Sequence, residues 1–238
     1  MNFAISLENC KSYIDCQLKR LESPGRRKTV DRQPLVVTIS RQAGAGGVTL
    51  GEKLAEHLQR REPQAGCRWA VFDRNLVETV LRDHHYSERI AGFMPERQRS
   101  AIQDAVEELL GLHPSSWTLV EKTSETILHL AEAGHAIIVG RGANVIIGFR
   151  PGAYHVRLVG SVEKRLENLQ EYYQFSPRKA REYLQRTDRG RRWYLKKQFG
   201  KNIEDPLLYH LVLNMDAISI EQAAEIIGEA ALRSQEGD

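Results

Sequence analysis

The chain has 238 residues, of which 41% are hydrophobic and 27% are charged, a composition that is ordinary for a soluble protein with a sizeable core. Its formal net charge of +3 is too small to indicate a polyanion as partner of the whole chain. No stretch approaches the length of a membrane span, and the N-terminus lacks the apolar run of a secretory signal, so we expect neither.

The first predicted element is a helix over residues 5–21, because apolar side chains recur there at spacings of three and four. Pro24-Gly25 then breaks the pattern and indicates a linker. We therefore expect an N-terminal helix with its linker over residues 1–33 and a main domain over 34–238. The helix should be tied on loosely, be separable from the body, and pack either on it or on a second subunit.

The main domain alternates short apolar runs with helical patterns. Strands are predicted at 35–40, 67–73, 135–142, 154–161 and 209–215. Helices are predicted between and after them, at 47–61, 74–83, 97–111, 115–133, 162–173 and 176–200, the last interrupted at Gly190 and Gly200, followed by a closing helix that Ser219 can cap. This order predicts an α/β fold with a mostly parallel five-stranded sheet and helices on both faces. In such sheets ligands bind beyond the carboxyl ends of the strands.

The segment SRQAGAGGVTL, residues 40–50, lies between the first strand and the first helix of this domain. A phosphate-binding loop belongs there, yet the pattern G-x-x-x-x-G-K-[ST] is incomplete, since Arg41 stands at the first glycine, Gly47 at the lysine, and Thr49 one position late. Backbone N–H groups and a helix N-terminus can still bind an anion without the lysine. The alternative is a glycine-rich turn that only allows close strand–helix packing.

Two more strand ends carry polar residues. Asp73 could orient acceptor hydroxyls, hold a metal through water, or cap the helix that starts at Arg74. Arg141, in the sequence Gly140-Arg141-Gly142, suits phosphate through its guanidinium fork, or could form a salt bridge to a neighbouring helix.

A basic segment lies between Arg178 and Lys201, with ten Lys and Arg residues against Glu182 and Asp188. This local positive field indicates an anionic ligand. Because the basic residues are confined to one segment, nucleotide phosphates are favoured over nucleic acid, although RGRRW could also stack on a base. The three cysteines, Cys10, Cys16 and Cys67, match no zinc spacing, so we expect reduced thiols, no disulfide, and a cytoplasmic protein.

Four segments together resemble the cytidylate-kinase-like family, relatives of the P-loop nucleoside monophosphate kinases: VVTISRQAGAGGVTLGEKLA, FDRNLVETV, IIVGRGANVI and YHLVLNMDAISIEQAAEII. The resemblance covers roughly residues 35–230. It implies a P-loop kinase fold, with a helical acceptor-binding insertion over 88–133 and a lid over 176–200. It also implies phosphoryl transfer from ATP, with Mg²⁺, to a nucleoside monophosphate.

The resemblance extends to individual positions. Gly44, Gly46 and Thr49 match loop positions of cytidylate kinases, and Arg141 matches the arginine that meets phosphate in those enzymes, although Gly142 replaces their aspartate. In the lid, Asp188 and Arg191 match their D-x-x-R, with Arg186 close to a preceding R-D pair that is not matched.

These observations give one working hypothesis and two alternatives. The expected function is an ATP-dependent phosphotransferase acting on a small acceptor such as CMP, and no metal ligand is assigned. The expected nucleotide-binding residues are Gly44, Ala45, Gly46, Gly47, Val48, Thr49 and Asp73, and the expected catalytic residues are Arg41, Arg141, Arg186, Asp188 and Arg191. The alternatives are a nucleotide-binding regulatory protein without turnover and an RNA-associated protein that uses the basic segment.

Overall fold

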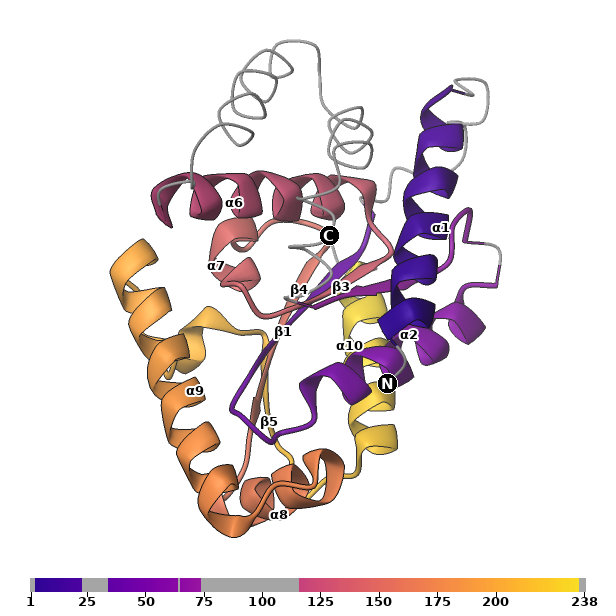
Figure 1. Ribbon diagram of the computed structural model, residues 1–238. Coiled ribbons are helices and arrows are strands. Elements are labelled where there is room, and N and C mark those ends of the chain that lie inside the picture. The colour runs from indigo at the N-terminus through magenta and orange to yellow at the C-terminus, as the bar shows by residue number, and fades with distance from the viewer. Residues whose placement is uncertain (1–2, 23–33, 64, 74–115, 236–238) are drawn as a thin grey trace.

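The structure is a computed structural model that describes residues 3–22, 34–63, 65–73 and 116–235 (Figure 1). The linker, the predicted helices at 74–83 and 97–111, and most of the predicted acceptor-binding insertion lie outside the described residues.

The predicted five strands are present and form one parallel sheet. They are β1 (Val36–Arg41), β2 (Ala70–Phe72), β3 (Ala136–Val139), β4 (Ala153–Val159) and β5 (Leu211–Asn214). The spatial order is β2-β3-β1-β4-β5, and every neighbouring pair is parallel. This confirms the α/β class and the P-loop kinase fold. β1 lies at the centre, so the chain following it emerges between the ends of β3 and β4.

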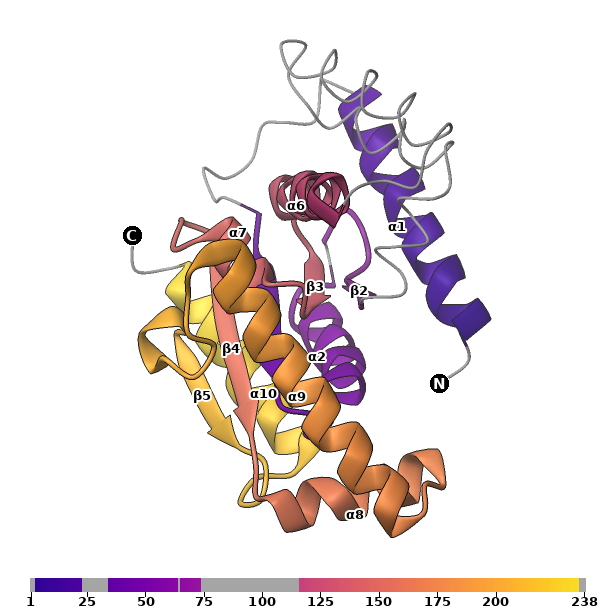
Figure 2. The same ribbon diagram turned by 60° about the vertical axis from the view of Figure 1, so that its left-hand side comes forward.

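Helices cover both faces of the sheet (Figure 1). On one face lie α2 (Gly47–Arg61) and α10 (Ile220–Ser234), which share a core cluster with β1, β3 and β4. On the other lie α1 (Phe3–Glu22), α6 (Ser116–Ala133) and the short α7 (Ala143–Ile147), which was not predicted. Beyond the carboxyl end of β4 come α8 (Val162–Tyr173) and α9 (Pro177–Phe199), which runs back along the sheet toward α7 (Figure 2). A short 3-10 helix, Pro206–Leu208, precedes β5.

The residues predicted to start and end helices do so in the structure, with one exception. Ser219 accepts a hydrogen bond from the amide of Gln222, which completes a capping box at the start of α10. Gly200 ends α9 in the left-handed conformation. The expected interruption at Gly190 is wrong, because α9 continues through it. Buried residues on both sides of it, among them Leu184 and Leu195, pack α9 against the body, which offsets a glycine cost of about 1 kcal/mol.

The expectation that α1 is tied on loosely is also wrong. Tyr13 and Ile14 are almost fully buried in the same core cluster as Phe72 of β2. The Tyr13 hydroxyl donates a hydrogen bond to the Gly134 carbonyl, and Gln17 Nε2 donates to Ala133 O at 3.1 Å. Helical periodicity showed which face is apolar, but it could not show that this face completes the core beside an edge strand.

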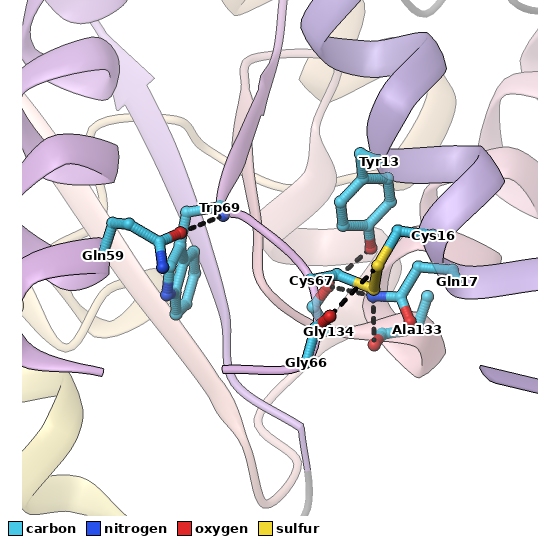
Figure 3. Close-up of a disulfide and its surroundings, with 9 residues drawn as sticks. All are labelled: Tyr13, Cys16, Gln17, Gln59, Gly66, Cys67, Trp69, Ala133 and Gly134. Atoms are coloured by element: carbon cyan, nitrogen blue, oxygen red, sulfur yellow. Dashed lines mark hydrogen bonds between the residues drawn. A yellow bond between two sulfur atoms is a disulfide. The ribbon is translucent and has the colours of Figure 1, made fainter. Parts of the chain in front are cut away.

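A disulfide joins α1 to the segment that precedes β2, between Cys16 and Cys67 (Figure 3). The prediction of reduced thiols is therefore wrong for these two residues, while Cys10 is free and buried. The two cysteines are 51 residues apart, so their spacing carried no sign that α1 lies against this segment. The argument for a cytoplasmic protein that rested on reduced thiols does not hold.

Candidate functional site

The polar residues at the strand ends gather at the carboxyl edge of the sheet, as predicted. Arg41 ends β1, Asp73 follows β2 and Gly140 follows β3, and these three strands are adjacent. The segment from Arg41 to Gly46 then leads into α2, and we call it the β1–α2 loop. Gly46 is the N-cap of α2, has a φ of 74°, and receives no side-chain cap. The amides of the first helical turn have no carbonyl one turn earlier to bind, so they are available to an anion.

The loop glycines also have packing roles. A side chain at Gly44 would collide with the backbone of Arg165 in α8, and one at Gly46 would come within 2.8 Å of Ile220 Cδ1. Both glycines have positive φ values as well. The close-packing interpretation is thus supported at these two positions whether or not an anion binds, and a branched residue at Gly46 would disturb the fold directly.

The other predicted loop residues differ in what they can offer a ligand. Ala45 is buried and the Val48 side chain packs against the α2–α10 core cluster, so only their backbone groups can face a ligand. Thr49 is partly exposed in the first turn of α2. The Gly47 position is close to Arg41, because a Cβ there would lie 2.9 Å from Arg41 Cγ.

Arg41 lies at the centre of the site. Its side chain passes between Gly47 and Gly140, where a Cβ at either position would meet it. Burial and, after it, the charges of Arg191 and Arg141 lower the pKa of Arg41 to about 9, while Asp73 opposes them. The residue as a whole is half-buried, so we expect this crowded positive charge to remain within reach of an anion.

Arg191 approaches Arg41 from α9. Its Nη1 donates a hydrogen bond to the Arg41 carbonyl at 2.9 Å, and burial lowers its pKa while Asp188 raises it. Arg141 comes from the turn after β3, in a left-handed conformation with φ of 56°. The structure therefore brings together three of the predicted catalytic arginines, and each comes from a different element.

The main partner of Asp188 is Arg165 of α8. Its Oδ2 accepts a hydrogen bond from Arg165 Nη1 at 2.6 Å, and its Oδ1 accepts one from the Ala43 amide at 2.7 Å. Arg191 Nη1 is more distant, at 3.9 Å from Oδ1. Asp188 and Arg165 are both buried. The carboxylate thus fastens α9 to α8 and to the β1–α2 loop, and its contact with Arg191 is secondary.

The structure does not bring Arg186 to the other site residues. It lies two positions before Asp188 on α9, which is about 200° around the helix, and its side chain is exposed.

Two functional candidates were missed from the sequence. Arg157 of β4 is 5% exposed and donates a hydrogen bond to Ser40 Oγ at 2.9 Å, while the Tyr209 hydroxyl donates to the same oxygen at 3.3 Å. The Arg157 charge also lowers the pKa of Arg191. Arg157 could have been found from the sequence, because an arginine inside an apolar strand pattern is unusual and indicates a specific role. No such signal marks Arg165, because it stands in an ordinary helical mixture of charged residues.

The residues present suit Mg²⁺ only with help from a nucleotide. Within the described part of the chain, no three His, Cys, Asp or Glu side chains are grouped to hold a metal ion. Mg²⁺ commonly takes one or two protein oxygens and completes its shell with phosphates and water, and Asp73, which is close enough to Arg41 to affect its pKa, could supply one of them. In the described ranges, no helix is long and apolar enough to cross a membrane.

Comparisons with known proteins agree with this architecture. The model of the cytidylate kinase-like family matches residues 36–217. A solved structure of an uncharacterized protein from Eubacterium ventriosum is similar in fold, with a TM-score of 0.62 and 17% identity over 85% of this chain and 99% of that one. A shikimate kinase from Bacteroides thetaiotaomicron gives a TM-score of 0.47 at 15% identity, over 82% of this chain and 97% of that one. No functionally curated protein matches the sequence.

Proposed function

The chain belongs to the cytidylate kinase-like family, and on this premise we propose that it moves the γ-phosphoryl group of ATP to a small anionic acceptor. The family and the fold support a kinase-like phosphotransferase. A nucleoside monophosphate such as CMP is our first choice of acceptor, because the family is named for that activity. A cytoplasmic location is part of the same proposal and rests on the family alone, because the Cys16–Cys67 disulfide does not favour it.

The observation that carries the proposal is the grouping of arginine side chains at the carboxyl edge. The charges of Arg191 and Arg141 both act on Arg41, and Arg157 lies close enough to affect Arg191. Asp73 also acts on Arg41, whereas Asp188 is bound by Arg165. Positive charges grouped in this way repel one another, and an anion bound among them relieves the repulsion. Phosphoryl groups suit this requirement, since guanidinium groups bind their oxygens in pairs.

Each element then has a role that follows from its position. The backbone of the β1–α2 loop and the N-terminus of α2 would hold donor phosphates. Arg41 would supply the positive charge that a loop lysine provides elsewhere, and Arg141 and Arg191 would neutralise the transferring group. Mg²⁺, held by Asp73, Thr49 and the nucleotide, would neutralise part of the negative charge on the phosphates. Catalysis of this kind depends on positioning and electrostatics rather than on a covalent intermediate.

A nucleotide-binding regulatory protein without turnover is the second candidate. Two sequence observations favour it: the missing loop lysine, and Gly142 where cytidylate kinases have an aspartate. The same arginines would then bind a nucleotide but would not promote transfer.

One experiment separates the two candidates. ADP release would be screened over nucleoside monophosphates and small phosphorylated metabolites, and ATP affinity would be measured by calorimetry on the same preparation. Turnover that disappears in an Arg41→Ala variant supports the phosphotransferase and excludes a contaminating kinase. ATP binding with no turnover over the whole screen supports the regulatory protein. A folded protein that does not bind ATP contradicts both.

A further inference from the structure

We propose that the outward face of α9 is a docking surface for a single-stranded polynucleotide, separate from the site at the β1–α2 loop. The outward face consists of the exposed Lys and Arg side chains between Arg178 and Lys197, together with Trp193. Its centre, at Arg189, Trp193 and Lys196, lies on the other side of the helix from Leu184 and Arg191, and α9 extends across the front of the molecule in Figure 2.

The charge of the chain is concentrated on this one helix. α9 carries nine Lys and Arg residues against Glu182 and Asp188, and Asp188 is buried in its pair with Arg165. Because the whole chain has a net charge of only +3, acids outnumber basic residues in the rest of it. The positive field is therefore directed, and it steers polyanions to this face.

The geometry of the helix distinguishes basic residues that face the β1–α2 loop from basic residues that face solvent, which the sequence alone could not do. Buried positions recur along one side at helical spacing and include Leu184, Asp188 and Leu195. Arg189, Trp193 and Lys196 are exposed on the opposite side. A nucleotide held at the β1–α2 loop would contact the inner side only, so the outer cations stay available to a second anion.

Little on the protein surface neutralises the outward face. Within the described residues its ion pairs are Arg178 with Glu182 at 3.5 Å and Arg192 with Glu204 at 3.4 Å. Exposed pairs of this kind are weak and easily exchanged. α9 has 23 residues and is about 35 Å long, which matches an extended strand of several nucleotides better than one small anion.

An exposed aromatic ring favours a nucleic acid over other polyanions. Trp193 is 57% exposed, and Lys197 Nζ lies 4.6 Å from its ring centroid. A ring beside cations is an arrangement on which a base can stack while its phosphates are bound. Trp193 is the only large apolar side chain exposed on α9, which is too few for a membrane-binding helix.

A single strand fits better than a duplex. The inner side of α9 is packed against α8 and the loop through Ala180 and Leu184. The exposed Trp193 ring gives the stronger reason, because it can stack on unpaired bases, whereas the bases of a duplex are already stacked on one another.

The test is fluorescence anisotropy of the full chain with labelled oligo(U) and oligo(dT) of about 20 nucleotides. We expect the logarithm of the association constant to fall linearly with the logarithm of the salt concentration. An Arg189→Glu/Lys196→Glu variant should lose at least about tenfold in affinity. Trp193→Ala should lose about fivefold or more at unchanged net charge. Arg60→Glu/Arg233→Glu is the matched control, because it makes the same charge change on exposed positions of α2 and α10 and should lose less than about twofold.

Each alternative outcome overturns the proposal. If neither oligonucleotide binds at low salt, the proposal is wrong. It is also wrong if the matched control loses as much affinity as the α9 variant, because the loss would then be a nonspecific effect of net charge. Competition by saturating ADP would place the strand at the β1–α2 loop instead. Equal binding of polyglutamate or of vesicles rich in anionic lipid would identify a different class of partner. Preference for oligo(U) indicates RNA, and equal affinities indicate single strands in general, and both support it.

Discussion

Asp188 and Arg165 form a buried ion pair, with 2.6 Å between Oδ2 and Nη1, which joins the two helices that follow β4. The same carboxylate accepts a hydrogen bond from the amide of Ala43, and Arg165 Nη1 donates to the Ala43 carbonyl at 3.2 Å. The basic helix is therefore connected directly to the backbone of the β1–α2 loop. Any movement of α9 must break this connection or carry the loop with it.

The first prediction concerns this pair. Asp188→Ala should lower the free energy of unfolding by about 3–5 kcal/mol, because it leaves the Arg165 guanidinium buried without its carboxylate. Urea denaturation measures the loss. Glu167→Ala is the control, since it removes an exposed pair with Lys164 and should change little. A double Asp188→Leu/Arg165→Met variant should recover much of the loss. Equal stability of the Asp188 variant and the control would contradict the structural role.

Arg191→Ala should impair turnover much more than folding. The side chain is charged and close to Arg41, and the variant loses one hydrogen bond to the Arg41 carbonyl, worth about 1 kcal/mol. Steady-state kinetics with the best acceptor and a thermal melt give the two readouts. Arg60→Ala, an exposed change on α2, should affect neither. A large fall in melting temperature with normal turnover in the surviving protein would show that Arg191 is structural.

Reduction of the Cys16–Cys67 disulfide should lower stability while α1 stays in place. Opening a covalent loop of 51 residues removes up to about 4 kcal/mol in the chain-entropy description. The buried contacts of Tyr13 and Ile14 do not depend on the bond. Burial also raises the pKa of the Cys10 thiol to about 12, so Cys10 should not react with a thiol reagent in the native reduced protein, whereas the half-buried Cys16 should. Rapid reaction of Cys10 would show that α1 detaches.

Stability should fall with acid because of His155. Burial lowers the pKa of this histidine to about 4, below its ordinary value of 6.5, and the charges of His210 and Arg150 act in the same direction, while the hydrogen bond to the Gly148 carbonyl opposes them. As the pH falls, His155 is therefore protonated in the unfolded chain before it is protonated in the folded protein. The stability that neutral His155 contributes is fully present above pH 6.5 and is lost as the pH falls toward 4. The loss is about 3 kcal/mol. Urea denaturation at several pH values should show a shallower slope for His155→Gln, and parallel slopes would exclude His155 as the cause.

The sequence predicted those features that depend on local patterns. Alternating strands and helices, the Ser219 cap and the strand ends at Arg41, Asp73 and Gly140 all follow from periodicity and chain order. Features that depend on distant pairings were not predictable, because no local signal marks them: α1 in the core, the Cys16–Cys67 bond and the Arg165 partner of Asp188. The basic segment is intermediate, because its composition was visible but only helix geometry assigns Arg191 and Arg186 to different sides.

The last prediction concerns Arg41, whose replacement should lower turnover without lowering the melting temperature. If the guanidinium neutralises the transferring phosphoryl group, Arg41→Met should lower turnover by about 10³-fold, the scale at which one arginine acts in phosphoryl transfer. ATP affinity should fall much less, because a contact that strengthens in the transition state affects rate more than ground-state binding.

The melting temperature should stay constant or rise in this variant. Burial and the charges of Arg191 and Arg141 already oppose the charged form of Arg41, which is the reason that its pKa is lowered to about 9. Methionine keeps most of the apolar contact between Gly47 and Gly140 and removes the repulsion. Kinetics, calorimetry and a thermal melt would be run on the same preparation. A marked fall in melting temperature with unchanged turnover would make Arg41 a structural residue, and the loop would then have no substitute for the missing lysine.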